Sequence, residues 1–303
     1  MKHLLTLKNW SGKEIVKLVR LSKKIKKKPH NYENKLRNKT LLMVFAKPSL
    51  RTRLSFDVAM HKLGGHAIFY SLGNSTLGKK ESIKDFSKVI SRYADIVMAR
   101  LHKHEEILEI AKHSDVPVIN GLTNSYHPCQ ILGDFLTIKE KLGNLKKVKI
   151  AYLGDANNNV THSLIIGCHK VGIDLVVSSP NKKEFLPDER LIGNSKYTYE
   201  KDAKKAVKRV DIIYTDSWMS YHIPPSQEKR RARTLKNYQV NKKLFDVNKK
   251  ALFMHNLPAH RGQEVTDEVI DSKRSIVYDQ AENKVHSEKA VLLKLLGKKK
   301  RYN

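Results

Sequence analysis

The segment from Phe45 to Phe56 has the residue types and spacing best suited to chemistry in this 303-residue chain. Ser49, Arg51, Thr52 and Arg53 crowd what the sequence predicts to be the first turn of a helix. The open amides of such a turn attract anions, and guanidinium groups bind phosphate oxygens through paired hydrogen bonds. The turn therefore predicts a binding site for a small dianion such as phosphate. The alternative is a capped surface helix whose arginines face water.

A buried strand and a helix are needed to position this segment. The apolar run Leu41–Phe45 predicts a strand that stops at Pro48, which has no amide hydrogen for a sheet. Ser49 can then cap the helix. We expect the inward stripe of this helix to be formed by Leu54, Val58 and Leu63.

Two further strand-to-helix junctions supply similar chemistry. A strand predicted at Asp95–Ala99 is followed by Arg100, and His127-Pro128 opens a helix predicted over Ile131–Leu142. Ligands gather outside the carboxyl ends of parallel strands, so Arg100 and His127 are expected to face the same crevice as Arg51. A lone histidine is more often structural, and it is the agreement of three junctions that favours a site.

The second half of the chain offers polar groups of a different kind. Asp216 follows a strand predicted at Ile212–Thr215, and Asn256 follows one predicted at Ala251–Met254. Together with Asn159 and Ser220, these side chains suit an amine or amino acid, because carboxylates and amide carbonyls accept hydrogen bonds from ammonium. The alternative is that Asp216 only caps the segment that follows it.

Alternating strands and helices predict an α/β protein with two similar three-layer domains, each with a mostly parallel sheet flanked by helices, linked by interdomain helices. We place the domains at residues 1–140 and 141–284, with a hinge near Gly143–Lys147 and a C-terminal helix, 285–303, packing back on the first domain. The predicted strands of the second domain include Ser275–Tyr278. Ser71–Glu81 is expected to be a polar loop.

Composition excludes several classes of protein. The net charge is +29, but the lysines are scattered and no nucleic-acid-binding signature accompanies them, so we expect no specific nucleic-acid partner. No apolar run approaches the length of a membrane span. Cys129 and Cys168 lack metal-ligand spacing, Cys129 is expected to be a core residue, and we expect a cytoplasmic protein. Gly154–Asn159 lacks the G-x-G-x-x-G pattern of nicotinamide-binding turns.

Four ordered motifs resemble the aspartate and ornithine carbamoyltransferase family, and within it the ornithine branch. Ser49-Leu50-Arg51-Thr52-Arg53 resembles its S-T-R-T-R motif, and His127-Pro128-Cys129-Gln130 resembles its H-P-C-Q motif. Residues 216–220 resemble its D-x-x-x-S segment, and residues 255–258 resemble its H-C-L-P segment. The resemblance runs nearly from end to end.

The resemblance implies transfer of the carbamoyl group of carbamoyl phosphate to the δ-amine of L-ornithine, giving L-citrulline and phosphate in arginine metabolism. It implies no metal and no cofactor, and a homotrimer in which a neighbour's loop, Ser71–Glu81 here, completes each active site as the domains close. The implied catalytic residues are Arg51, Arg100, His127, Asp216 and Asn256. The implied carbamoyl phosphate contacts are Ser49, Leu50, Arg51, Thr52, Thr76, Arg100, His127, Gln130, Asn256, Leu257 and Lys284. The implied ornithine contacts are Asn159, Asp216, Ser220 and Tyr221.

The sequence departs from the family pattern at the site itself. Leu50 replaces a threonine, Asn256 replaces the cysteine of H-C-L-P, and Lys284 replaces an arginine. Lysine keeps the charge but loses the bidentate fork. Further departures are Thr76, Lys79, Tyr221 and His222. They leave two alternatives open: another acceptor amine, such as putrescine or an acylated ornithine, or a non-catalytic carbamoyl phosphate-binding protein.

Overall fold

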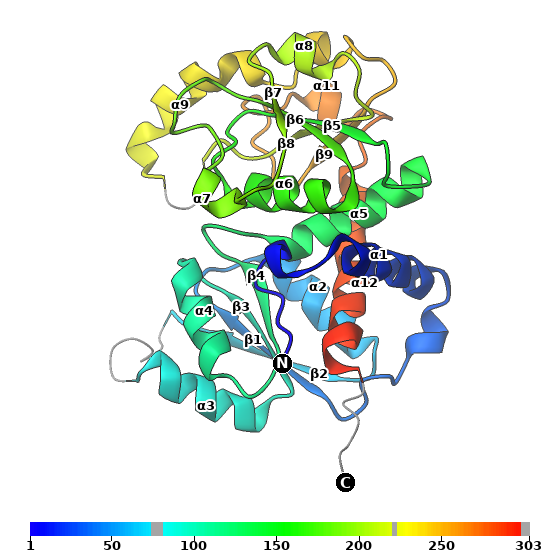
Figure 1. Ribbon diagram of the computed structural model, residues 1–303, viewed down its shortest axis with the longest axis vertical. Helices are drawn as coiled ribbons and strands as arrows, with labels where there is room; N and C mark the ends of the chain where they lie inside the picture. Colours follow the sequence, from blue (N-terminus) through cyan, green and yellow to red (C-terminus); the bar gives the residue numbers. More distant parts are fainter. Residues whose placement is uncertain (74–80, 220–222, 298–303) are drawn as a thin grey trace. The chain divides into compact units, whose positions relative to one another are not determined.

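The computed structural model describes residues 1–73, 81–219 and 223–297 (Figure 1). The chain forms two compact units, which we describe separately. The first unit contains Met1–Leu136 and the chain from Asn283 onward, and the second contains Thr137–Glu282. The chain passes between them within two helices, α5 (Pro128–Leu142) and α12 (Val277–Leu296).

The first unit is built on a four-stranded parallel sheet with the order β2-β1-β3-β4. Its strands are β1 (Thr40–Phe45), β2 (His66–Ser71), β3 (Ile96–Arg100) and β4 (Val118–Leu122). Helices α3 (Ile83–Tyr93) and α4 (His104–His113) lie on one side of this sheet, and α2 (Leu50–His61) lies on the other (Figure 1). The remaining helical elements are η1 (Leu7–Asn9), α1 (Gly12–Lys27) and η2 (Pro29–Tyr32).

Burial explains the order of these layers. Val44, Val97, Ala99 and Val118 point from the sheet into a core shared with α3 and α4. Strand β3 is buried along its whole length, as expected for a central strand covered by helices on both faces. Strand β4 is also buried throughout, although it is the last strand of the sheet, and Leu4 forms an isolated bridge to its Ile119. The parallel register pairs Phe45 with Arg100, so that β1 and β3 end together. Their carboxyl ends therefore present one common edge.

The structure shows that the predicted inward stripe of α2 is wrong for two of its three residues. Leu63, just beyond the helix, is buried, but Leu54 is 51% exposed and Val58 is 37% exposed. The helix instead buries Thr52, Ser55, Phe56, Ala59 and Met60. The prediction was wrong because it assumed that the apolar residues mark the inner face, whereas the buried face includes two hydroxyl side chains. The outer face of α2 therefore carries exposed apolar side chains.

The second unit has a five-stranded parallel sheet with the order β7-β6-β5-β8-β9. Its strands are β5 (Lys149–Leu153), β6 (Asp174–Ser178), β7 (Thr198–Tyr199), β8 (Ile212–Thr215) and β9 (Leu252–His255). Its longer helices are α6 (Asn159–Val171) and α9 (Glu228–Leu235). Shorter elements are α7 (Glu189–Ile192), α8 (Ala203–Val207), η3 (Pro225–Gln227), η4 (Lys236–Tyr238), α10 (Lys242–Phe245) and α11 (Asp267–Ile270).

The structure confirms the predicted fold class, with two parallel sheets flanked by helices, but overturns one predicted strand. Ser275 makes only an isolated bridge to Phe253, and α12 begins at Val277. The run Ser275–Tyr278 was ambiguous because a short apolar run fits a buried strand and a helix start equally well. The last helix consequently begins eight residues before the predicted start at 285. No helix in the described ranges is long and apolar enough to cross a membrane.

Candidate functional site

The first turn of α2 lies where the sequence predicts an anion-binding turn, and we call residues 49–52 the cradle. Ser49 caps the helix, and its hydroxyl accepts a hydrogen bond from the Thr52 amide at 3.3 Å. Thr52 is buried and Arg51 is half-buried beside it, whereas the Leu50 side chain is 71% exposed. Leu50 can therefore offer a ligand in this cradle only its backbone amide. A threonine is not required at this position for that contact.

Arg100 reaches the same turn from the end of β3. Its Nη1 donates to the Thr52 hydroxyl at 3.4 Å, and its side chain is buried. The register of β1 and β3 accounts for this meeting, since it brings Arg100 level with the strand end that leads into α2. Arg100 also lowers the pKa of Lys47, after the larger effect of burial. Positive charge thus gathers at the edge of the first sheet.

His127 lies at the start of α5 and is buried. Burial, together with the charges of Lys284 and Arg100, lowers its pKa well below the ordinary range. Its imidazole is therefore neutral and able to donate one hydrogen bond. Gln130, one turn later, donates to Asp134 at 2.9 Å. This bond fixes the Gln130 side chain, so the predicted donors near His127 are held in place.

Cys129 is a buried core residue, as predicted. Its thiol donates to the Asn120 carbonyl oxygen at 3.4 Å. Burial and the nearby Glu288 carboxyl raise its pKa well above the ordinary value. A thiol held in the protonated form is a poor nucleophile, so the arrangement gives Cys129 no direct part in chemistry.

Lys284 enters the same cluster from α12. It is buried, and its stem packs against Gly133 of α5, where an added Cβ would lie 3.4 Å from the Lys284 Cγ. Burial lowers the Lys284 pKa, and Arg100 and Arg51 lower it further. Three cations therefore converge on one small region of the first unit. Such a group of cations suits a compact ligand with more than one negative charge.

The second unit brings Asp216 and Asn256 together at the ends of β8 and β9. Burial raises the pKa of Asp216, and the His255 ring and a hydrogen bond from the Asn256 side chain act against that rise. The side-chain amide of Asn256 thus donates a hydrogen bond to the Asp216 carboxylate. The arrangement leaves Asp216 as a hydrogen-bond acceptor with a raised affinity for a proton.

His255 is held in one tautomer by its neighbours. Its Nδ1 accepts a hydrogen bond from the Leu257 amide at 2.8 Å, so the N–H of the ring lies on Nε2. That nitrogen lies 3.2 Å from Glu264 Oε1, which also accepts from the His260 amide at 2.6 Å. This buried chain of contacts fixes the turn that carries Asn256 and Leu257.

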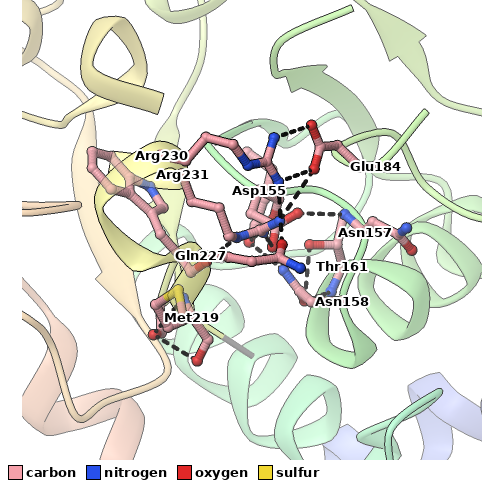
Figure 2. A network of polar contacts seen from close by, with 12 residues as sticks. Asp155, Asn157, Asn158, Thr161, Glu184, Met219, Gln227, Arg230 and Arg231 are labelled. Atoms are coloured by element: carbon pink, nitrogen blue, oxygen red, sulfur yellow. Dashed lines mark hydrogen bonds and ion pairs between the residues drawn. The ribbon is translucent and has the colours of Figure 1, made fainter. Parts of the chain in front are cut away.

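A buried ion pair that the sequence did not reveal connects two further segments of the second unit, the turn before α6 and the segment after β8. Arg231 of α9 pairs with Asp155 (Figure 2). The Arg231 Nε also donates to the Trp218 carbonyl oxygen at 3.0 Å. Asp155 lies in the turn after β5, four residues before Asn159, and Trp218 lies two residues after Asp216. Burial raises the Asp155 pKa to about 7, while Arg231 lowers it. Arg231 therefore joins the turn before α6 to the segment after β8.

We expect Arg231→Met to lower the free energy of unfolding by about 3–5 kcal/mol, because it leaves the Asp155 charge buried without a positively charged partner. The measurement is the urea unfolding curve followed by circular dichroism. The matched control is Arg230→Met on the same helix, which removes an exposed ion pair with Glu184 and should change the curve little. Equal shifts for the two variants would contradict this role for Arg231.

Other predicted residues divide into those the structure places and those it leaves out. Asn159 is the first residue of α6, whose cap is Asn158. Thr76, Ser220 and Tyr221 lie outside the described residues, as do Lys79 and His222. Within the described part of the chain, no group of three or more His, Cys, Asp or Glu side chains could hold a metal ion.

Comparison with known proteins matches both halves of the chain. Residues 2–140 match the aspartate/ornithine carbamoyltransferase carbamoyl-P binding domain, and residues 146–295 match the Asp/Orn binding domain. An ornithine carbamoyltransferase of Pyrococcus abyssi is 47% identical, covering 95% of this chain and 92% of the relative. An anabolic ornithine carbamoyltransferase of Pyrococcus furiosus is 45% identical, and the match covers 98% of this chain and 96% of the relative. The structure of ornithine carbamoyltransferase from Pyrococcus furiosus superposes with a TM-score of 0.92 at 44% identity, covering 99% and 98% of the two chains.

Proposed function

Because the chain belongs to the aspartate/ornithine carbamoyltransferase family, we propose that it transfers the carbamoyl group of carbamoyl phosphate to the δ-amine of L-ornithine, giving L-citrulline and phosphate. The observation that carries this proposal is the convergence of Arg51, Arg100 and Lys284 beside the neutral His127. Full-length similarity to ornithine carbamoyltransferases supports the choice of acceptor.

The first unit, close to the domain that we place at residues 1–140 with the C-terminal helix, binds carbamoyl phosphate. Ser49, Arg51, Thr52, Lys284 and the Leu50 amide hold the phosphate, and Arg100, His127 and Gln130 contact the carbamoyl group. Attack on the carbonyl carbon places negative charge on its oxygen. Donors that are already fixed stabilise this charge without reorganising, and losing one typically costs about a hundredfold to a thousandfold in rate. The neutral His127 serves here as a hydrogen-bond donor.

The second unit, close to the domain that we place at residues 141–284, binds ornithine through Asn159, Asp216, Ser220 and Tyr221. The lone pair of the δ-nitrogen forms the new C–N bond, and the bond from carbon to the phosphate oxygen breaks as phosphate leaves. The Asp216 carboxylate orients the amine and takes up its proton, aided by its raised pKa. Asn256 and Leu257 are further contacts that we propose for carbamoyl phosphate.

We further propose a cytoplasmic homotrimer whose active sites are shared between subunits, with Ser71–Glu81 reaching a neighbour and the domains closing over the substrates. Exposed apolar side chains support a subunit contact. Leu50, Leu54 and Val58 recur every four residues on the outer face of α2, and Ile68 and Tyr70 are exposed on the edge strand β2. Both cysteines are free, which fits a reducing compartment. The proposed reaction requires no metal or cofactor.

A steady-state assay with four acceptors in parallel tests the proposal. Carbamoyl phosphate is supplied with L-ornithine, putrescine, N-acetylornithine or aspartate, and carbamoylated product and phosphate are both measured. We expect turnover with ornithine at a kcat/KM above that of every other acceptor. A preference for putrescine or the acylated ornithine would overturn the acceptor assignment, and no turnover with any of the four would favour a non-catalytic binding protein.

A further inference from the structure

Glu288 is a buried acid beside the phosphate cradle. It lies on α12, is 1% exposed, and follows Lys284 by four residues, so the two side chains share one face of the helix. Neither of its carboxylate oxygens makes a well-oriented hydrogen bond within the described part of the chain. Burying a charge without such partners is costly. A carboxyl group in this position is therefore poised to change its protonation state.

The groups around Glu288 come from every element of the cluster. Lys284 lies on α12, Arg51 and Ser55 on α2, Arg100 at the end of β3, and His127 and Cys129 at the start of α5. Lys284 is tied electrostatically to Glu288, Arg100, Cys129 and Arg51. Lys284 and the Ser55 hydroxyl both lower the pKa of Glu288, whereas burial raises it to about 8. Among the side chains named in this paragraph, Glu288 carries the carboxyl group, and Lys284, Arg51 and Arg100 are the cations.

We propose that Glu288 is a further residue of the carbamoyl phosphate site: where it is ionised in the free protein, its carboxylate offsets the charge of Lys284, and it takes up a proton when the phosphate dianion binds. This inference rests on the proposed function. In the free protein above about pH 8, the negative charge of Glu288 offsets the positive charge of Lys284. A bound dianion takes over that role and leaves a buried carboxylate near a negatively charged ligand, which favours protonation. The proton comes from solvent and returns to it when phosphate leaves.

The direction of the pH dependence follows from linkage. Below about pH 8, Glu288 is already protonated in the free protein, so ligand binding takes up no proton there. Above that pH, the free protein must gain a proton in order to bind. Affinity is therefore expected to fall by up to about tenfold per pH unit above pH 8, because one pKa unit corresponds to a factor of ten.

Calorimetry with phosphonoacetamide, a stable analogue of carbamoyl phosphate, tests this inference in buffers of different ionisation enthalpy. The wild type is compared with the double variant Lys284→Arg/Glu288→Gln, in which arginine stays charged and glutamine stays neutral. At pH 8 we expect the wild type to take up about half a proton more than the double variant, since about half of the free molecules lack that proton. The ligand's own titration cancels in this difference. The control Lys284→Arg keeps the acid and should keep the uptake.

A second measurement needs no variant. The infrared difference spectrum of the wild type on ligand binding at pH 8 should lose carboxylate absorption and gain protonated carboxyl absorption. Equal proton uptake in the wild type and the double variant would overturn the inference and leave the proposed function intact. The same holds if the ratio of the wild-type affinity to the double-variant affinity is constant at every pH. A wild type that binds no phosphonoacetamide would overturn both.

Discussion

Replacing Arg51 with alanine is expected to weaken binding of phosphonoacetamide by at least about thirtyfold, because truncating one partner of a desolvated charge pair costs about 2–5 kcal/mol or more. Arg51 lies one residue before the buried Thr52, in a turn whose amides and cations all suit one phosphate. Its planar fork can bind two phosphate oxygens at once, which no single remaining group replaces. Calorimetry without ornithine measures the loss directly.

The neighbouring arginine provides the control for this experiment. Arg53 lies on the same helical turn, but its side chain is exposed and its guanidinium lies 3.9 Å from the centre of the Phe69 ring. We expect Arg53→Ala to leave phosphonoacetamide affinity within about twofold, since the lost cation–π contact is worth about 0.5–1 kcal/mol of stability. Near-normal affinity of Arg51→Ala would show that the cradle does not bind phosphate.

Asp216→Asn is expected to lower kcat with ornithine by about a hundredfold to ten-thousandfold, the usual contribution of a positioned base. The substitution preserves shape but removes the acceptor of the amine proton. Because burial raises the Asp216 pKa, the wild-type rate should fall with decreasing pH at a higher pH than an ordinary carboxyl would give. The pH profile of kcat measures both effects, and this acid limb should disappear in the variant.

Asp211 provides the matched control for Asp216. It lies just before the other end of β8, is exposed, and accepts from the Lys149 amide at 2.8 Å. Asp211→Asn should leave kcat within about twofold, because it is remote from the carboxyl end of the strand where ligands gather. An Asp216→Asn variant that keeps both its rate and its acid limb would remove Asp216 from the chemistry.

The sequence was most informative where local pattern and fold agree. Apolar runs predicted β1, β3 and β8, and the strand-end rule placed Arg100 near Thr52, as the 3.4 Å contact shows. The same reasoning failed for Leu54 and Val58, because residue type alone does not show whether an apolar side chain of a helix faces the core or the surface of the protein. It also failed at Ser275–Tyr278, where four apolar or small residues cannot distinguish a strand from a helix start.

Long-range charge pairs escaped prediction for a different reason. Arg231 and Asp155 are 76 residues apart, and neither differs in type from the many exposed charges of this chain. Glu288 is likewise distinguished only by its burial. Burial of a charged residue depends on the packed structure, so a single sequence gives little signal for it. These buried charged groups were therefore visible only in the fold.

Following the carbonyl carbon of labelled carbamoyl phosphate by NMR tests the central claim most directly. The unmodified protein is incubated with carbamoyl phosphate, labelled at that carbon, and L-ornithine, and released phosphate is measured in the same sample. We predict that the label appears in the ureido group of citrulline, with one phosphate released for each citrulline formed. Label that remains in carbamoyl phosphate, or appears only in its breakdown products at the rate seen without protein, would contradict the proposed reaction.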